Sequence, residues 1–139
     1  MSLTPRLSKR GCFSKVSKRA IFFLYTACML MTSLIPMDNT KGSLSFWAGM
    51  DPTLQNLLHV PMFMVFIYLC NQALEEVVRK MARRVWVVLG FAAFLGIFME
   101  GIQIVVPGRY PSGGDIMLNF IGAVSGVLLL LKVMQNRER

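Results

Sequence analysis

The feature of this sequence that most constrains its fold is a series of four long apolar runs. They extend over residues 20–36, 57–74, 85–106 and 116–134. Each run is close to the roughly 20 residues that an α-helix needs to cross the hydrocarbon core of a membrane. Backbone polar groups inside a bilayer must be satisfied within the protein, and a helix does this within one segment. The sequence therefore predicts an all-α integral membrane protein, a bundle of four transmembrane helices.

The second helix is expected to begin before its apolar run. Asp51 can cap it, and Pro52 suits the first helical position because no hydrogen bond is lost there. The predicted spans are then about 20–36, 53–74, 85–106 and 115–134, within one transmembrane domain of residues 20–134. A basic tail, 1–19, precedes this domain and a short tail, 135–139, follows it. The chain is 55% hydrophobic and 16% charged, which is typical of membrane proteins.

Basic residues are unevenly distributed among the connections. Of the 15 Lys and Arg residues, six precede the first span, four lie between the second and third, and three, Lys132, Arg137 and Arg139, lie at the end of the chain. The other two connections hold one each, Lys41 and Arg109. Because cytoplasmic segments carry the excess of Lys and Arg, both termini and the 75–84 connection are predicted to be cytoplasmic. Membrane topology and contact with anionic lipids thus explain the net charge of +8, and no nucleic-acid partner is expected.

Polar groups that membrane spans rarely contain gather near the predicted outer face. His59 lies early in the second span, Glu100 near the end of the third, and Asn119 near the start of the fourth. Each is within about 10 Å of its helix end, at 1.5 Å per residue. With residues of the intervening connection, they predict one outward-facing polar pocket. Its expected members are His59, Glu100, Gln103, Arg109, Asp115 and Asn119.

The carboxylate of Glu100 is the most unusual of these groups. A charged side chain costs at least about 2.5–3.5 kcal/mol at mid-span and less near the interface. Glu100 is therefore expected to be protonated, paired or open to water. Arg109 can fold back over the site and pair with Glu100 or Asp115, which leaves guanidinium donors for a phosphate or carboxylate.

Structural roles explain the same residues. Glu100 and Gln103 can form an interhelical hydrogen-bond clamp, and Arg109 can anchor the chain to lipid phosphate. Ser112, with Asp115 three residues later, fits a helix cap. Gly122 and Gly126 form a small-xxx-small face for helix packing, within the chain or between chains.

Candidate catalytic residues are His59, Glu100 and Asp115, which could act as acid or base groups. No spacing of ligands supports a metal site, and no cofactor is expected. The three cysteines, Cys12, Cys28 and Cys70, are expected to be free thiols because nothing in their spacing pairs them.

A longer pattern extends from the third span into the fourth. It reads Glu100-x-x-Gln103, Pro107-Gly108-Arg109-x-x-Ser112-x-x-Asp115-x-x-x-Asn119 and Gly122-x-x-x-Gly126, with His59 early in the second span. This pattern resembles VanZ-like membrane proteins over residues 51–130. These are small bacterial four-span proteins named after a member associated with resistance to the glycopeptide teicoplanin. The chain departs from the family where Gln55, Asn56 and Phe63 replace the usual Asp, Lys and Tyr around the histidine.

The resemblance implies a multi-pass protein of the bacterial cytoplasmic membrane, and three functions remain open. The pocket could bind a polar or anionic lipid headgroup or cell-envelope precursor, linked to glycopeptide or envelope-stress tolerance. The protein could instead be a non-catalytic subunit of a larger membrane complex, or an enzyme acting on a lipid-linked substrate. Expected partners are membrane lipids, a lipid-linked precursor or other membrane subunits. The expected ligand-binding residues are Glu100, Gln103, Arg109, Ser112, Asp115 and Asn119.

Overall fold

The computed structural model describes residues 7–36, 51–109 and 112–137, and within them it contains helices and no strand. The helices are α1 (Leu7–Ser33), α3 (Pro52–Leu57), α4 (His59–Leu74), α5 (Met81–Gln103) and α6 (Gly113–Arg137). The predicted all-α class is confirmed.

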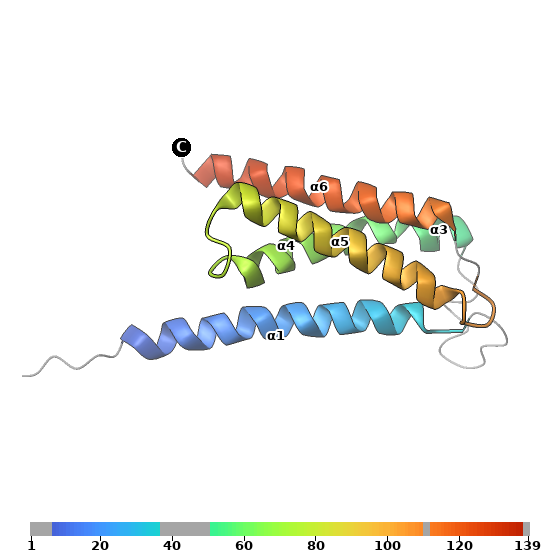
Figure 1. Ribbon diagram of the computed structural model, residues 1–139, viewed down its shortest axis with the longest axis horizontal. Coiled ribbons are helices and arrows are strands. Elements are labelled where there is room, and N and C mark those ends of the chain that lie inside the picture. Colours follow the sequence, from blue (N-terminus) through green and yellow to red (C-terminus); the bar gives the residue numbers. More distant parts are fainter. Residues whose placement is uncertain (1–6, 37–50, 110–111, 138–139) are drawn as a thin grey trace, which may run out of the picture.

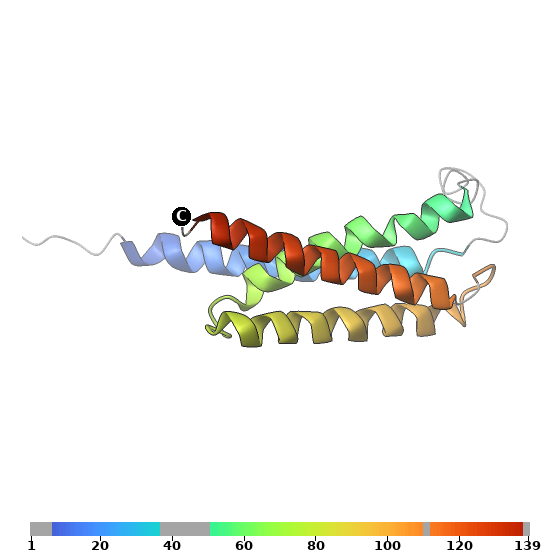
Figure 2. The same cartoon turned by 90° about the horizontal axis from the view of Figure 1, so that it is seen from above.

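The long helices lie side by side and alternate in direction (Figure 1; Figure 2). The start of α1, the α4–α5 connection and the end of α6 lie at one end, which we call the basic end. The end of α1, the start of α3, the end of α5 and the start of α6 lie at the opposite end, which we call the cleft end. The start of α1 and the end of α6 therefore lie at the same end of the bundle.

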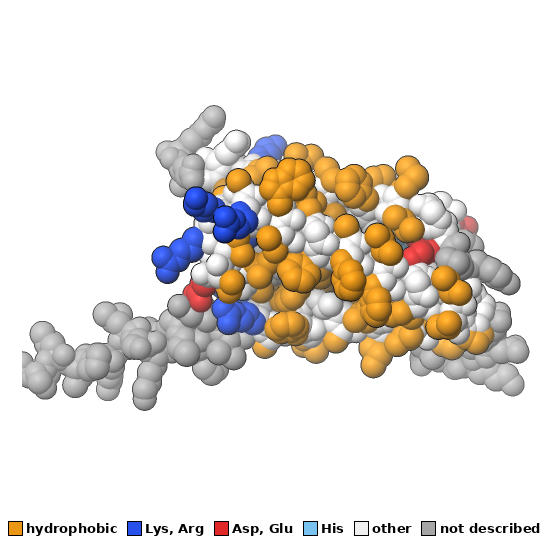
Figure 3. Space-filling view, in the orientation of Figure 1, with side chains coloured by type: hydrophobic (Ala, Val, Ile, Leu, Met, Phe, Trp, Pro, Cys, Tyr) orange, Lys and Arg blue, Asp and Glu red, His pale blue; other side chains and the backbone are white. Residues whose placement is uncertain are grey.

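Charged and apolar side chains are separated along the bundle axis. Figure 3 shows Lys and Arg side chains at the basic end and hydrophobic side chains over the middle of the visible face. Exposed Arg79, Arg83 and Lys132 belong to the basic end, and large apolar side chains such as Phe94 and Leu128 are more than 60% exposed. An apolar belt above a basic end is the arrangement expected of a protein that crosses a membrane.

Three segments are long and apolar enough to cross a membrane: Thr53–Leu74, Met81–Gln103 and Gly113–Asn136. They correspond to the second, third and fourth predicted spans, although α5 begins and ends a few residues before the predicted 85–106. The first span, 20–36, stays a prediction. Its helix α1 begins at Leu7 rather than near residue 20, because residues 7–19 contain no proline and their Lys and Arg residues favour helix.

The second span is a helix with an interruption at Leu58, between α3 and α4. Asp51 caps its start, as predicted, because its carboxylate accepts hydrogen bonds from the amides of Thr53 and Leu54 at 2.8 and 3.3 Å. These bonds, with one from the Thr53 side chain, hold the pKa of the Asp51 carboxyl below its ordinary value. Pro61 has no N–H to donate to the Leu57 carbonyl oxygen, so the hydrogen-bond ladder of the second span is broken there.

Helix α4 lies at the centre of the bundle, and its most extensive contact is with α6. A Cβ atom added to Gly122 would lie 2.5 Å from the Val60 carbonyl oxygen, and one added to Gly126 would lie 3.0 Å from Met64 Cα. Only glycine therefore allows α6 to approach the α4 backbone this closely. The predicted small-xxx-small face is used within the chain.

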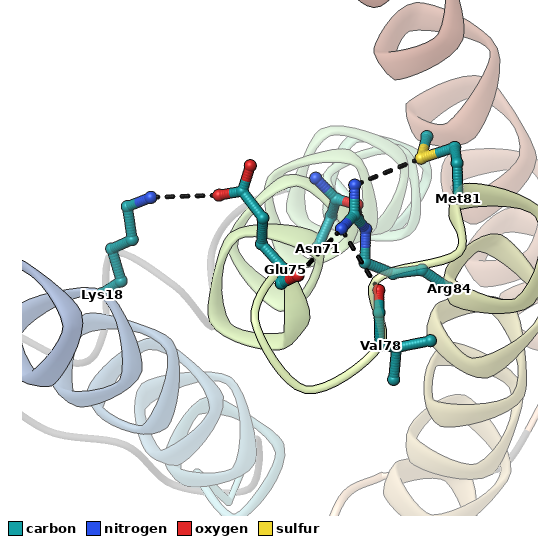
Figure 4. A network of polar contacts seen from close by, with 6 residues as sticks. All are labelled: Lys18, Asn71, Glu75, Val78, Met81 and Arg84. Atoms are coloured by element: carbon teal, nitrogen blue, oxygen red, sulfur yellow. Dashed lines mark hydrogen bonds and ion pairs between the residues drawn. The ribbon is translucent and has the colours of Figure 1, made fainter.

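Arg84 holds the basic end together, as Figure 4 shows. Its guanidinium donates to Asn71 Oδ1 at 2.7 Å and to the carbonyl oxygens of Glu75 and Val78, both at 3.3 Å. Glu75 also pairs with Lys18 of α1 at 3.2 Å. Arg84 is only 5% exposed, so this residue of the basic connection is a buried tie between α4 and α5.

The Gly122→Ala variant should be destabilised by about 1–3 kcal/mol, because the added methyl group overpacks the α4–α6 contact. Thermal unfolding in detergent measures the change. Gly90→Ala is the matched control: an added Cβ there meets nothing within 4 Å. Its higher helix propensity should raise stability slightly, by up to about 1 kcal/mol. Equal melting temperatures for the two variants would contradict the close contact.

The Arg84→Ala variant should lose at least about 2 kcal/mol of stability, because a hydrogen bond to a charged group contributes about 1.5–3 kcal/mol and Asn71 Oδ1 loses its donor. Arg83→Ala removes the adjacent, exposed arginine and should leave the midpoint of denaturant unfolding nearly unchanged. A similar loss in both variants would show that the effect follows net charge rather than the buried contacts.

Candidate functional site

A cleft of about 470 Å³ opens at the cleft end, between α1, the α3–α4 segment, α5 and the start of α6. Four of the six predicted pocket residues line it: His59, Gln103, Arg109 and Asp115. Its other walls combine polar groups with apolar ones such as Met62 and Met99. The other two predicted members, Glu100 and Asn119, do not line the cleft.

His59 and Asn119 form a direct pair across the α4–α6 contact. His59 Nδ1 lies 2.7 Å from Asn119 Oδ1. Because an amide oxygen only accepts, the ring donates from Nδ1, and in its neutral form it keeps Nε2 as an acceptor. Asn119 is buried beside Gly96, whose missing side chain leaves room for it: a Cβ there would lie 3.3 Å from Asn119 Nδ2. The pair fixes the orientation of the histidine ring in the cleft.

Glu100 lies beside the cleft and closes the connection between α5 and α6. Its Oε1 accepts a hydrogen bond from the Ser112 amide. The Ser112 hydroxyl accepts from the Gly114 amide at 3.1 Å, so Ser112 caps α6 as predicted. In a capping box the acid three residues after the cap would bind the Ser112 amide. Here Glu100 of α5 takes that place, so Asp115 is not used as the reciprocal cap.

Three polar atoms of this region are buried and have no hydrogen-bond partner among the described residues: Glu100 Oε2, Asp115 Oδ1 and Asn119 Nδ2. The side chains of Glu100 and Asp115 are each 6% exposed. An unsatisfied buried polar group costs about 1–3 kcal/mol, and more when it is charged. A buried polar atom without a hydrogen-bond partner therefore calls for an explanation, such as a bound water molecule or ligand that completes the site.

Arg109 does not pair with Glu100 or Asp115, so that prediction was wrong. Its Nε donates to the Ile35 carbonyl oxygen at 3.2 Å and its Nη2 to that of Thr32 at 3.0 Å. The end of α1 attracts the guanidinium because its last carbonyls have no partners within the helix and carry the negative end of the helix dipole. Gly108, with φ 75°, forms the turn that precedes Arg109.

The carboxylates nevertheless act on Arg109 through space. Partial burial lowers the pKa of its guanidinium, and the negative charges of Asp115 and Glu100 oppose that shift. Its third nitrogen, Nη1, donates to none of the described residues. Arg109 thus stays beside the two acids, with one donor group available to a ligand.

Sequence reasoning missed the contribution of α1, which was expected only to pack. Tyr25, Thr32 and Ser33 line the cleft, and the Tyr25 hydroxyl donates to the Met62 carbonyl oxygen at 2.9 Å. That carbonyl lies one residue after Pro61, where the helix is irregular. Gln55 and His59, four residues apart in the second span, both line the cleft. A tyrosine in an apolar run carries no signal that would have identified it.

The site combines acceptors, one cation and an oriented histidine. Glu100, Asp115 and Arg109 can position a ligand by charge, and His59 can exchange a proton through Nε2. Among the described residues, no three His, Cys, Asp or Glu side chains gather as a metal site would require. Cys28 and Cys70, the cysteines whose side chains the structure describes, are free thiols, and Cys12 lies outside the described side chains.

Comparison with known proteins places this arrangement in a family. The family model of VanZ/LLP1 matches residues 9–135. No curated protein and no solved structure matches the chain. The match includes all four apolar runs and every residue of the cleft described above. The chain therefore belongs to the VanZ/LLP1 family.

Proposed function

We propose that this VanZ/LLP1 family protein binds, in the cleft, the polar headgroup of a membrane lipid or of a lipid-linked cell-envelope precursor. The observation that carries this proposal is the presence of unpaired, buried polar atoms on Glu100 and Asp115 next to a cleft of about 470 Å³. A network that only joined helices would satisfy its own members, whereas a binding site holds groups ready for a ligand.

The composition of the walls favours a ligand that is polar at one end and apolar at the other. Arg109, Asp115 and Gln103 provide polar contacts, whereas Met62, Val65 and Met99 provide apolar ones. A lipid headgroup with the first part of its acyl chains presents both surfaces. Its entry requires no path across the membrane, because the cleft lies at one end of the bundle.

Binding is favoured over covalent catalysis by the state of Ser112, the hydroxyl residue whose amide binds Glu100. Ser112 Oγ already accepts from the Gly114 amide and caps α6. His59 Nδ1 is engaged with Asn119, and no described contact joins His59 to Ser112. The residues thus lack the nucleophile–base hydrogen bond that covalent catalysis would use. In this proposal, tolerance to glycopeptides or envelope stress would follow from binding an envelope lipid.

The proposal also fixes a topology: four spans, with the basic end cytoplasmic and the cleft at the outer face of the bacterial cytoplasmic membrane. It is supported by the basic side chains at one end; of the Lys and Arg side chains described, only Arg109 lies at the other. In this topology α1 supplies the first span.

Labelling of single cysteines with a membrane-impermeant maleimide in intact cells tests this topology. In a variant without native cysteines, Pro107→Cys should be labelled, because it is exposed at the cleft end. Val77→Cys at the α4–α5 connection and Ser17→Cys on α1 should be labelled only after the membrane is opened. Labelling of Ser17→Cys together with Pro107→Cys in intact cells would contradict a fourth span.

Removing the unpaired acceptors should weaken lipid binding. Asp115→Asn and Glu100→Gln preserve shape but remove charge, and each should reduce the lipid that copurifies with the protein by about tenfold, corresponding to about 1.4 kcal/mol. Native mass spectrometry of the purified protein measures the bound lipid.

Glu75→Gln is the matched control, because this exposed carboxylate lies at the basic end and pairs only across the surface with Lys18. It should retain wild-type lipid. Thermal unfolding of each variant shows whether the fold persists. Full lipid retention by folded Asp115→Asn and Glu100→Gln would refute headgroup binding in the cleft.

A further inference from the structure

Two of the three buried polar atoms that have no partner among the described residues are carboxyl oxygens, of Glu100 and Asp115, and the third is the donor Nδ2 of Asn119. Asp115 and Arg109 line the cleft, and Glu100 lies beside it. The unpaired atoms on the acids are both acceptors if the acids are ionised, and His59 Nε2 is a third acceptor in the neutral ring. A ligand that only accepts hydrogen bonds, such as a simple anion, would leave all three unsatisfied.

The positive charge of Arg109 is already partly balanced. Two of its nitrogens donate to the Thr32 and Ile35 carbonyl oxygens, at the negative end of α1. The Asp115 and Glu100 charges act on it as well. An anionic group can contact the free Nη1, but when both carboxyls are ionised their two negative charges exceed the single positive charge of Arg109, which favours a cation. From the sequence, Arg109 was expected to bind a phosphate or carboxylate, whereas the charges around it in the structure favour a cationic group.

Asp115 is the group that faces the ligand. It lines the cleft and is 6% exposed, and its Oδ1 has no partner among the described residues. Because Glu100 binds the Ser112 amide, Asp115 is free of the usual capping role. A buried acceptor beside a second acid pairs best with a charged donor, and an ammonium group supplies three N–H donors.

We propose that the ligand is zwitterionic: a primary ammonium group that binds Asp115 and Glu100, joined by a short linker to a phosphate that contacts Arg109. An aminophospholipid headgroup and free phosphoethanolamine share this chemistry. This inference rests on the proposed function, the binding of a lipid headgroup, and it specifies the chemical class of that headgroup. The ammonium donates to the carboxylates, whereas a quaternary ammonium has the same charge and no N–H to donate.

A series of lipids with identical acyl chains tests the proposal on the unmodified protein. Phosphatidylethanolamine, its N-methyl and N,N-dimethyl forms and phosphatidylcholine lose one N–H donor at each step while the charges stay constant. Affinity, measured by native mass spectrometry in detergent, should fall along the series, by about tenfold in total. Phosphatidylglycerol, an anion without an amine, should bind no better than phosphatidylcholine.

Asp115→Asn separates recognition from folding. It should lower the affinity for phosphatidylethanolamine more than the affinity for phosphatidylcholine, because both lipids lose the attraction of the carboxylate but only phosphatidylethanolamine loses an N–H donor contact as well. Soluble phosphoethanolamine shows whether the ligand is the intact lipid or the free headgroup compound. Displacement of the lipid by millimolar phosphoethanolamine indicates that the headgroup alone is sufficient, and no displacement indicates that the lipid is required.

Equal affinities along the methylation series, or a preference for phosphatidylglycerol, would overturn this inference and leave headgroup binding intact. Absence of any cleft-dependent lipid would refute the proposed function itself.

Discussion

The close contact between α4 and α6 is the interaction on which the rest of the structure depends. Gly122 and Gly126 allow the α6 backbone to reach Val60 and Met64 on α4. Inside a membrane, helices gain little from hydrophobic burial against each other, so close packing of this kind has to supply the association. One turn before Gly122, Asn119 reaches His59, and the same contact that joins the helices thereby orients the histidine in the cleft.

Two arginines stabilise opposite ends of the bundle in the same way. Arg84 donates to the carbonyls that follow α4, and Arg109 donates to those at the end of α1. The last carbonyls of a helix lack partners within it, and water is scarce near a bilayer. A guanidinium with several donors in one plane can satisfy two carbonyls at once, which lysine does less well. Both arginines thus replace the solvent that would cover helix ends in a soluble protein.

The sequence predicted most of the fold because apolar runs and polar exceptions within them are local signals. Three spans, the cap at Ser112 and the convergence of His59, Glu100 and Asn119 follow from run length and helical spacing. The partners of Arg109 could not be predicted, since they are backbone carbonyls 74 and 77 residues away and no side chain marks them. Arg84 was treated as one of four basic residues because burial of a single arginine in a charged connection has no local signature.

The arrangement of the two acids determines what the cleft can bind. Glu100 satisfies the Ser112 amide, which in a self-contained cap would be bound by Asp115. Because Glu100 takes this role, Asp115 is free of it, but one oxygen of each acid is left buried without a partner. These unpaired oxygens lower stability, and capping the helix does not require them. Arg109 could have neutralised them, but α1 holds it. In the binding mode that we propose, a donor from outside the chain pairs with these two buried acceptors, and a cationic donor matches them best.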